Sequence, residues 1–596
     1  MCGIAGILNA DASATTELEE KLALLRRSLK HRGPDDEGLW VSADRLAGLV
    51  HTRLAILDLS PGGHQPMVSA DGNTCIVFNG EIYNFRSLRE ELEREGQVFR
   101  THSDTEVLLK LYQRDGAAMV KSLRGMFAFC IWDRLERRAL IARDPMGIKP
   151  LYYSVSGGRL AFASELRALQ SAGLCARCLN PSAVMQFFET GSVPEPLTLV
   201  EGVRCLPAGH TLTWNDGEAR EQCYWKIEFN AGDIRNENPI SLTRSALLDS
   251  ITHHFVSDVP VGIFLSGGID STAVLALARE SGQRDISTFS IGVDDAGLDE
   301  SSAAARTAAH FGTKHHEKRL NAQGLAQTFS GYLSHMDQPS IDGFNTYTVS
   351  GFAREHGMKV VLSGLGGDEL FGGYPSFQKV PQLRHLGQRL HAVPGLAQAV
   401  GWLAERHAPR LPFQRAGSFL QREPSTVNAF TAFRGIFARR DARRLAAEYC
   451  GGRSQDISDP APAAVSVGDE RDQVSACELS LYMRNQLLKD SDVMSMAHGL
   501  ELRVPLVDRV LFETVAKIPA STRLQPGKRL LIEAVPEVPE WISQAPKRGF
   551  LFPYEKWLAG EWGREFSKIS TRLGVTKPTW YQRWSGFMLE RWIERS

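Results

Sequence analysis

The sequence predicts two domains of different fold class: an N-terminal α+β domain of sheets covered by a few helices, and a C-terminal α/β domain with a doubly wound parallel sheet. Three observations support this prediction. A chain of 596 residues exceeds the size of one hydrophobic core. Strand-like segments outnumber helices up to about residue 225. From about residue 258 onward, strands and helices alternate.

In the N-terminal part, hydrophobic periodicity predicts both element types. Leucines recur at helical spacing from Leu18 to Leu29, and further amphipathic helices are predicted around 88–92 and 107–111. Strands are predicted at 49–57, 74–78, 126–132 and 139–142, the last two as a hairpin.

In the C-terminal part, five elements follow one another in βα alternation. They are a strand at 259–265, a helix at 271–280, a strand at 286–293, a helix at 301–310 and a strand at 360–362. Such alternation predicts a parallel sheet, whose ligands bind beyond the carboxyl ends of the strands.

The domain boundaries follow from these patterns. We place the first domain at 1–215, a connector at 216–235 and the second domain at 236–596. The proline-containing stretch 191–225 leads into the connector. Residues 375–477, rich in Arg, Ala and Leu, predict an added helical region within the second domain.

Composition excludes several classes of partner. The 68 basic residues balance 69 acidic ones, so the protein has almost no net charge that would attract nucleic acid or an anionic membrane surface. No apolar run of membrane-spanning length and no secretory signal is present, which predicts a cytoplasmic protein. Nine cysteines, an odd number, fit reduced thiols better than a disulfide framework. Cys175 and Cys178 form a pair without the second pair that a zinc site needs.

Cys2 is the first candidate for chemistry. Removal of Met1 would put a thiol and a free α-amine on one residue, and an amine with a pKa of about 8 can accept the thiol proton. The alternative is a small apolar residue at the start of a buried strand.

The loop after strand 259–265 is the second candidate. Two glycines, Gly267 and Gly268, permit close backbone approach, and hydroxyls at a helix N-terminus supply donors for pyrophosphate. Asp270 would repel phosphate unless Mg²⁺ bridges them. No lysine follows the glycines, which distinguishes the loop from one that transfers a γ-phosphate. A turn that merely joins strand to helix is the alternative.

A second glycine-rich loop, 363–369, follows strand 360–362 and is expected at the same edge of the sheet. Its Asp368 is placed to share the metal. A glycine-rich turn with an acidic helix cap is the alternative.

Together these residues carry a family resemblance that spans nearly the whole chain. The motifs are Cys2-Gly3-Ile4-Ala5-Gly6, His31-Arg32-Gly33-Pro34-Asp35, Asn79-Gly80-Glu81-Ile82-Tyr83-Asn84, Ser103-Asp104-Thr105-Glu106, Arg143-Asp144-Pro145-Met146-Gly147 and the loop from Ser266 to Ser271. In this order they resemble glutamine-hydrolysing asparagine synthetases.

For the first half, the resemblance implies a class II glutamine amidotransferase domain of the N-terminal-nucleophile type, a four-layer sandwich of two antiparallel sheets between helices. It implies that Cys2 attacks the glutamine amide and that Asn79 and the Gly80 N–H hold the oxyanion. Arg53 would bind the substrate carboxylate, and Glu81 and Asp104 its ammonium. Surface salt bridges are the alternative for these three charged residues.

For the second half, the resemblance implies that ATP adenylates a carboxylic acid and that ammonia then displaces AMP. Lys528 would stabilise charge on the reacting phosphates, and Asp270 and Asp368 would hold Mg²⁺; a solvated lysine is the alternative for Lys528. Arg503 is a further family-like position with a structural role. The residues expected at ATP are Leu265, Ser266, Gly267, Gly268, Asp270, Ser271, Thr272, Ile291, Ser363 and Gly364.

One departure from the family pattern bears on the acceptor acid. Where family members that act on aspartate carry a glutamate, this chain has Leu365, and Gly367 replaces the following serine. A leucine can neither accept a proton from ammonium nor hydrogen-bond an amine. The acceptor is therefore aspartate or another carboxylate, and the added length at 375–477 favours another.

Three functions remain open at this point. The first is a glutamine-dependent amide synthetase in which ammonia passes between two facing domains. The second is a ligase that forms an intramolecular amide without glutaminase use, and the third is a non-catalytic sensor of glutamine and ATP. The oligomeric state is also open, with a homodimer as one alternative.

Overall fold

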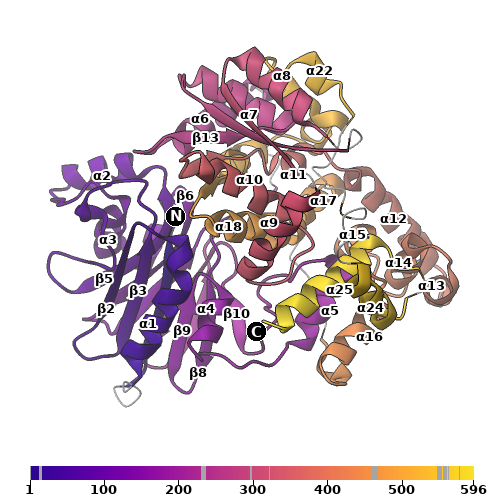
Figure 1. Ribbon diagram of the computed structural model, residues 1–596, viewed down its shortest axis with the longest axis horizontal. Coiled ribbons are helices and arrows are strands. Elements are labelled where there is room, and N and C mark those ends of the chain that lie inside the picture. Colours follow the sequence, from indigo (N-terminus) through magenta and orange to yellow (C-terminus); the bar gives the residue numbers. More distant parts are fainter. Residues whose placement is uncertain are drawn as a thin grey trace.

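The computed structural model describes residues 2–11, 17–229, 237–295, 299–320, 322–458, 468–546, 554, 560, 563–575 and 577–595. Two domains lie side by side, with the N-terminal sheets on the left of Figure 1 and the C-terminal sheet and helices above and to the right. The predicted division into an antiparallel sheet domain and a parallel α/β domain is confirmed.

The N-terminal domain contains two six-stranded antiparallel sheets. Their orders are β10-β8-β9-β1-β3-β2 and β12-β11-β7-β6-β5-β4. The strand bounds are β1 Gly3–Asn9, β2 Asp36–Val41, β3 Ala47–Arg53, β4 Met67–Val68, β5 Thr74–Ile82, β6 Gly125–Asp133, β7 Arg138–Arg143, β8 Tyr152–Ser156, β9 Arg159–Ala163, β10 Val203–Cys205, β11 His210–Asn215 and β12 Glu218–Cys223.

Both faces of each sheet are covered, which gives four layers. Along β1, Ile4 and Leu8 pack into the core between the sheets, whereas Ala5 and Ile7 pack toward helix α1 (Leu18–Leu29). Helices α2 (Phe85–Arg94) and α3 (Asp104–Asp115) cover the outer face of the second sheet. Because neither face of the central strands meets water, strands such as β6 and β7 are nearly continuous apolar runs.

The connection between the domains differs from the expectation. The connector predicted at 216–235 begins inside the hairpin of β11 and β12, which extends the second sheet. Asp216 and Gly217 both have positive φ, 46° and 85°, the conformation that an Asp-Gly hairpin turn requires. The predicted strand at 49–57 also ends early, at Arg53.

The C-terminal domain is built on one five-stranded parallel sheet with the order β15-β14-β13-β16-β17. Its strands are β13 Val261–Phe264, β14 Ser287–Val293, β15 Lys314–Leu320, β16 Val360–Leu362 and β17 Glu501–Arg503. The helices that cover it include α6 Pro239–His254, α7 Ile269–Glu280, α8 Ser301–Phe311, α10 Phe344–Glu355 and α18 Lys489–Met496.

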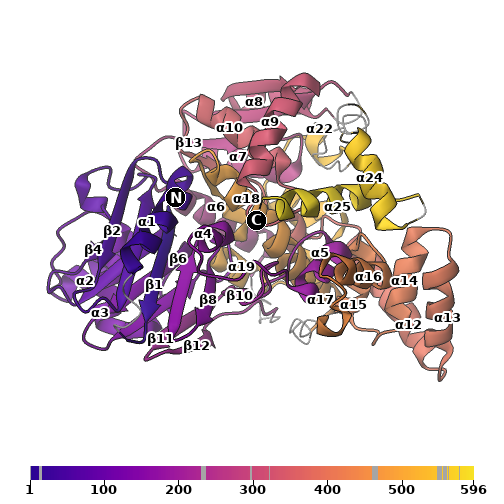
Figure 2. The ribbon, with the colours of Figure 1, turned by 60° about the horizontal axis from the view of Figure 1, so that its bottom comes forward.

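The predicted helical region is present, and its residues 376–420 project from the body of the molecule at the lower right of Figure 2. It comprises α12 Ser376–His391, α13 Leu396–His407, α14 Leu411–Leu420, α15 Thr426–Arg434 and α16 Arg439–Tyr449. It leads into one continuous helical stretch, α17 (Glu470–Cys477), the π-helical segment η6 (Glu478–Leu488) and α18. We call this stretch, 470–496, the bridging helix.

Buried ion pairs hold the two domains together. Arg124 of the first domain binds Asp508 of the second through two hydrogen bonds of 3.0 and 2.9 Å. Arg32 Nη2 donates to Asp492 on the bridging helix at 2.7 Å, and both side chains are fully enclosed. Such pairs fix one relative orientation, since separating them would leave unpaired charges out of water.

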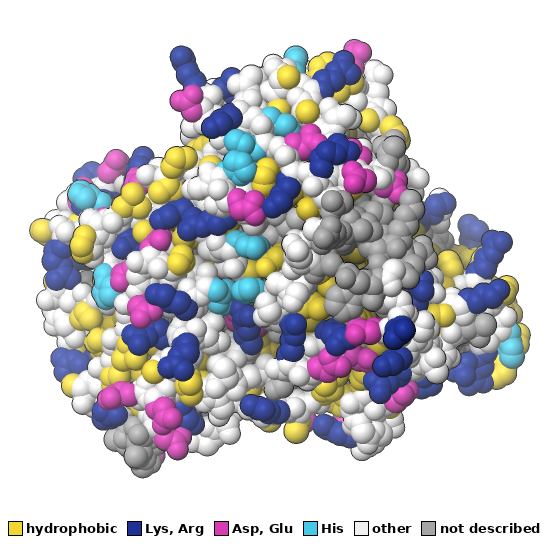
Figure 3. Space-filling view, viewed as in Figure 1, with side chains coloured by type: hydrophobic (Ala, Val, Ile, Leu, Met, Phe, Trp, Pro, Cys, Tyr) yellow, Lys and Arg dark blue, Asp and Glu magenta, His cyan; other side chains and the backbone are white. Residues whose placement is uncertain are grey.

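The surface agrees with the balanced composition. On the face in Figure 3, basic and acidic side chains are interspersed over both domains. Within the part of the chain that the structure describes, no helix is both long and apolar enough to cross a bilayer.

Candidate active sites

Cys2 lies directly before β1, at one end of an interior strand of the first sheet. The antiparallel register of β1 and β3 pairs Gly3 with Thr52, so Cys2 lies beside Arg53. The side chain is 8% exposed, and burial raises the pKa of its thiol while the charge of Arg53 opposes that rise. The backbone N–H of Cys2 donates to Asn79 Oδ1 at 3.0 Å. The nucleophile candidate and the oxyanion candidate are thus in direct contact.

Asn79 and Gly80 lie on β5, in the second sheet. Asn79 is fully buried, and its Nδ2 has no hydrogen-bond partner among the described residues. A buried, unpaired amide donor is costly unless a ligand completes it. Gly80 has a φ of 155°, and a Cβ there would lie 2.1 Å from the carbonyl oxygen of Met126. Only glycine therefore fits beside Asn79.

Three charged side chains surround these groups. Arg53 donates to the carbonyl oxygens of Ser60 and Leu57 at 3.1 and 3.3 Å, which fixes its guanidinium. Glu81 follows on β5. Burial and the charge of Glu501 raise its pKa well above the usual value.

Asp104 is the first residue of α3, and its Oδ2 accepts a hydrogen bond from the Ile82 N–H at 3.1 Å. Burial raises the pKa of Asp104 to about 6. This carboxyl is therefore charged at neutral pH, but at a cost in desolvation.

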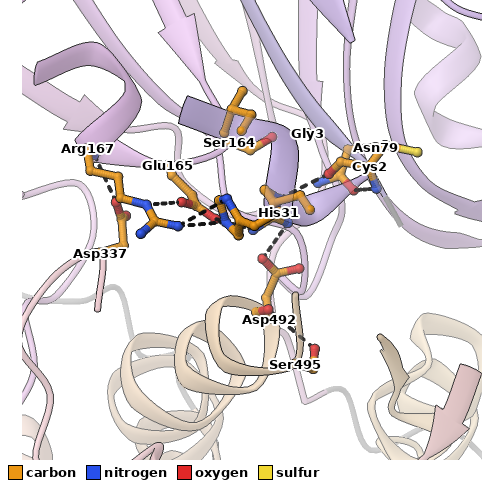
Figure 4. A network of polar contacts seen from close by, with 12 residues as sticks. Cys2, Gly3, His31, Asn79, Ser164, Glu165, Arg167, Asp337, Asp492 and Ser495 are labelled. Atoms are coloured by element: carbon orange, nitrogen blue, oxygen red, sulfur yellow. Dashed lines mark hydrogen bonds and ion pairs between the residues drawn. The ribbon is translucent and has the colours of Figure 1, made fainter. Parts of the chain in front are cut away.

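A network of buried polar groups extends from Cys2 to the second domain. Arg32 Nε donates to the Cys2 carbonyl oxygen at 3.1 Å, Nη1 to Glu165 at 3.0 Å and Nη2 to Asp492 at 2.7 Å. Figure 4 shows Cys2 and Asn79 at one end of this network and Asp492 on the helix below it. The motif containing Arg32 is visible in the sequence, but no local pattern indicates Asp492, 460 residues away.

In the second domain, the loop after β13 is closed by its own hydroxyls. Ser266 Oγ lies 2.9 Å from Ser271 Oγ and accepts from the Gly268 N–H at 3.1 Å. Gly364 of the second loop packs against it, because a Cβ at Gly364 would lie 2.7 Å from the Ser271 nitrogen. The two predicted loops therefore meet, as the shared sheet edge requires.

Lys528 lies between the two predicted metal-binding acids. Its Nζ is 2.6 Å from Asp270 Oδ2 and 2.5 Å from Asp368 Oδ1. Although burial disfavours the charged form, the two carboxylates raise the pKa of Lys528 above its usual value. Two carboxylates that converge on one cation are hard oxygen ligands of the kind that Mg²⁺ prefers, so the residues present fit that ion.

These groups line a single cavity of about 1200 Å³. Of the ten residues expected at ATP, nine line it, namely Leu265, Ser266, Gly267, Gly268, Asp270, Ser271, Ile291, Ser363 and Gly364. Thr272 does not; it is fully buried, and its hydroxyl donates to the Gly268 carbonyl oxygen at 2.9 Å. Leu365 and Lys528 also line the cavity, as does part of the helical region.

Two further lining residues escaped the sequence analysis. Glu369 is 1% exposed and accepts a hydrogen bond from the Tyr374 hydroxyl at 2.9 Å, and burial and the charge of Asp368 raise its pKa to about 8. Arg415 reaches the cavity from α14. An acidic pair after glycines is visible in the sequence, but nothing in the helical region indicates which arginine faces the cavity.

Comparisons with known proteins cover both domains. A family model for a glutamine amidotransferase domain matches residues 1–225, and one for asparagine synthase matches residues 242–575. Glutamine-hydrolyzing asparagine synthetase 1 of Bacillus subtilis is 35% identical over 94% of this chain and 88% of its own length. Amidase chry2 of Gibberella zeae is 28% identical over 96% of this chain and 92% of its own.

The two matched domains define the class: a carbon–nitrogen ligase with a glutamine amidotransferase domain fused to a synthetase domain. Within that class, the chain belongs to the glutamine-hydrolysing asparagine synthetase family. The roles of the individual residues stay predictions.

Proposed function

We propose that the protein hydrolyses glutamine at Cys2 and uses the ammonia to amidate a carboxylic acid that ATP has activated as an acyl-adenylate. One observation carries this proposal. The bridging helix contacts the Cys2 network through Asp492, while its residues Tyr482 and Gln486 line the cavity of the two glycine-rich loops. A nitrogen-releasing site and an activating site therefore share one rigid element.

At the first site, Cys2 Sγ attacks the amide carbon of glutamine, with the α-amine freed by loss of Met1 as the base. Asn79 Nδ2 and the Gly80 N–H donate to the oxyanion. Collapse of the tetrahedral species releases ammonia and leaves a thioester, which water hydrolyses to glutamate. The unpartnered Asn79 Nδ2 supports this role, because a bound oxyanion would complete it.

Substrate recognition at this site uses opposite charges at fixed positions. Arg53 binds the α-carboxylate of glutamine, and Glu81 and Asp104 bind its ammonium. The raised pKa of Asp104 supports the assignment, since a buried carboxylate that has hydrogen bonds but no cationic partner gains most from a substrate cation.

At the second site, a carboxylate oxygen of the acceptor attacks the α-phosphorus of ATP, and pyrophosphate leaves. The Ser266–Ser271 loop holds the pyrophosphate, and Lys528 balances the negative charge that develops. Asp270 and Asp368 would hold Mg²⁺, which when bound would neutralise phosphate charge. Ammonia then attacks the acyl carbon and AMP leaves.

The acceptor is a carboxylic acid other than free aspartate. Leu365 is half-buried, lines the cavity and packs against the core, so its position offers no proton acceptor. An apolar group there suits an acid with an apolar body.

The nine cysteines, all free in the described residues, support a reducing location such as the cytoplasm.

The test compares glutamine and ammonia as nitrogen sources. Cys2→Ala should abolish glutamine-dependent amide formation while ammonia-dependent formation persists. Cys175→Ala is the matched control, because it removes a thiol that lies outside both sites. Equal loss of both activities in Cys2→Ala would contradict separate sites. Asp270→Ala should suppress acid-dependent pyrophosphate release, and formation of ADP would refute adenylation.

A further inference from the structure

The helical region contributes one wall of the ATP cavity. Its lining residues there are Leu411, Pro412, Arg415, Phe433, Arg434, Gly435 and Ile436. A series of contacts joins this wall to the metal-binding acids. Tyr374 bonds Glu369, beside Asp368, and the Arg434 guanidinium lies 4.4 Å from the Tyr374 ring centroid and 3.7 Å from that of Tyr482. Arg415 lies beside Gly435 in the same wall.

Arg415 differs from Arg434 and Arg439, two arginines that follow it in the helical region, in having no acid beside it. Arg434 is 2.6 Å from Glu478, and Arg439 is 3.1 Å from Glu189. Arg415 Nε is buried without a hydrogen-bond partner, and no ion pair involves this side chain among the described residues. Burial lowers its pKa, and no neighbouring carboxylate offsets that effect.

Arg415 is half-buried, and a guanidinium there without an acid is unfavourable, because the group stays protonated and has lost part of its water. Such a group is kept where a ligand supplies the missing anion. A guanidinium offers two parallel N–H donors, which match a carboxylate or a phosphate. The proposed function already assigns the ATP phosphates to Lys528 and the glycine-rich loops, which leaves Arg415 as a cavity-lining cation without an assigned anion.

We propose that Arg415 binds a second anionic group of the acceptor acid, a carboxylate or a phosphate, while the carboxylate to be amidated lies at the glycine-rich loops. The inference rests on the proposed function. Tyr374, Phe433 and Tyr482 also line the cavity, and Tyr374 and Tyr482 contact Arg434 of the same wall, so an apolar or aromatic body of the acceptor fits there. The acceptor class is therefore an elongated dianionic acid.

The test measures pyrophosphate release by the full-length protein with ATP and Mg²⁺. The probes are aliphatic and aromatic dicarboxylic acids, carboxyalkyl phosphates, and the half-amide or free alcohol that lacks the second charge of each. The wild type should prefer a dianion over its singly charged partner by about 100-fold in kcat/KM. Comparison of the dicarboxylate and phosphate series identifies which anion Arg415 binds.

Arg415→Met should abolish this preference, and Arg415→Lys should restore part of it. Arg422→Met is the matched control, because Arg422 also lies half-buried in the helical region but does not line the cavity. Calorimetric titration of the same probes gives a readout that needs no turnover. Circular dichroism checks that each variant is folded.

Equal binding and turnover of dianions and their singly charged partners, or a dianion preference that survives in Arg415→Met, would overturn the inference. Pyrophosphate release with singly charged acids would still support the proposed function in that case. Failure of the proposed function has a different signature, namely ADP as product or loss of ammonia-dependent amidation in Cys2→Ala.

Discussion

Asp104→Asn should gain stability relative to the wild type as the pH rises from about 4 to about 7. The difference between their free energies of unfolding should grow over this range. The side chain is buried, and its pKa is raised from 3.8 to about 6. Between these two values the unfolded chain has lost a proton that the folded protein still holds. Stability therefore falls as pH rises through this window, and it is level above about pH 6. Asparagine carries no such proton, so the variant escapes the loss.

The magnitude follows from the shift. A rise of roughly two units, at about 1.4 kcal/mol per unit, corresponds to about 3 kcal/mol. The hydrogen bond from the Ile82 N–H contributes at every pH, because an asparagine oxygen can accept it too. At each pH, the free energy of unfolding of the wild type is subtracted from that of the variant. The prediction concerns how this difference changes with pH.

Urea unfolding, followed by circular dichroism at several pH values, measures that change. Asp216→Asn is the control, because Asp216 lies at an exposed hairpin turn with a φ of 46° that asparagine also tolerates. A stability difference for Asp104→Asn that is constant across the pH range would refute the reasoning. If Asp104→Asn is more stable than the wild type but has lost glutaminase activity, Asp104 serves substrate binding at the expense of stability.

Three further outcomes are expected. The KM for glutamine should rise about tenfold per pH unit below about pH 6, as Asp104 gains a proton, and a flat profile would contradict its role with the substrate ammonium. Asn79→Ala should lower the kcat of glutamine hydrolysis by about 10² to 10³, and an unchanged kcat would exclude it from the oxyanion site. Gly364→Ala should raise the KM for ATP in pyrophosphate release, because its Cβ would lie 2.7 Å from the Ser271 nitrogen; unchanged ATP kinetics would show that the loops tolerate separation.

Local sequence signals predicted most of the fold. The leucine spacing of α1 and the apolar run before Ser266 each report the environment of one element, and the structure has both. The β11–β12 hairpin was missed although Asp216-Gly217 is a recognised turn signal, because short polar strands lack clear alternation. The length of the strand at Arg53 was overestimated, since the apolar run continues beyond the last sheet pairing.

The site was predicted only where its residues sit in compact motifs. Cys2 and Asn79 lie in such motifs, and their contact follows from the stacking of two sheets. The pairing of Arg32 with Asp492 depends on how the domains meet, and the isolation of Arg415 depends on which acids surround it. Both features depend on contacts between residues far apart in the chain, so the spacing of residues in the sequence could not predict them.

The π-helical geometry of η6 sets a length constraint on the bridging helix. Each residue of a helix turns the chain by a fixed angle, so a deletion between Tyr482 and Leu488 would rotate everything after it relative to everything before it. Tyr482 would keep its place in the cavity while Asp492 swung away from Arg32. Insertions and deletions here should therefore uncouple glutamate formation from amide formation, even where each half-reaction survives.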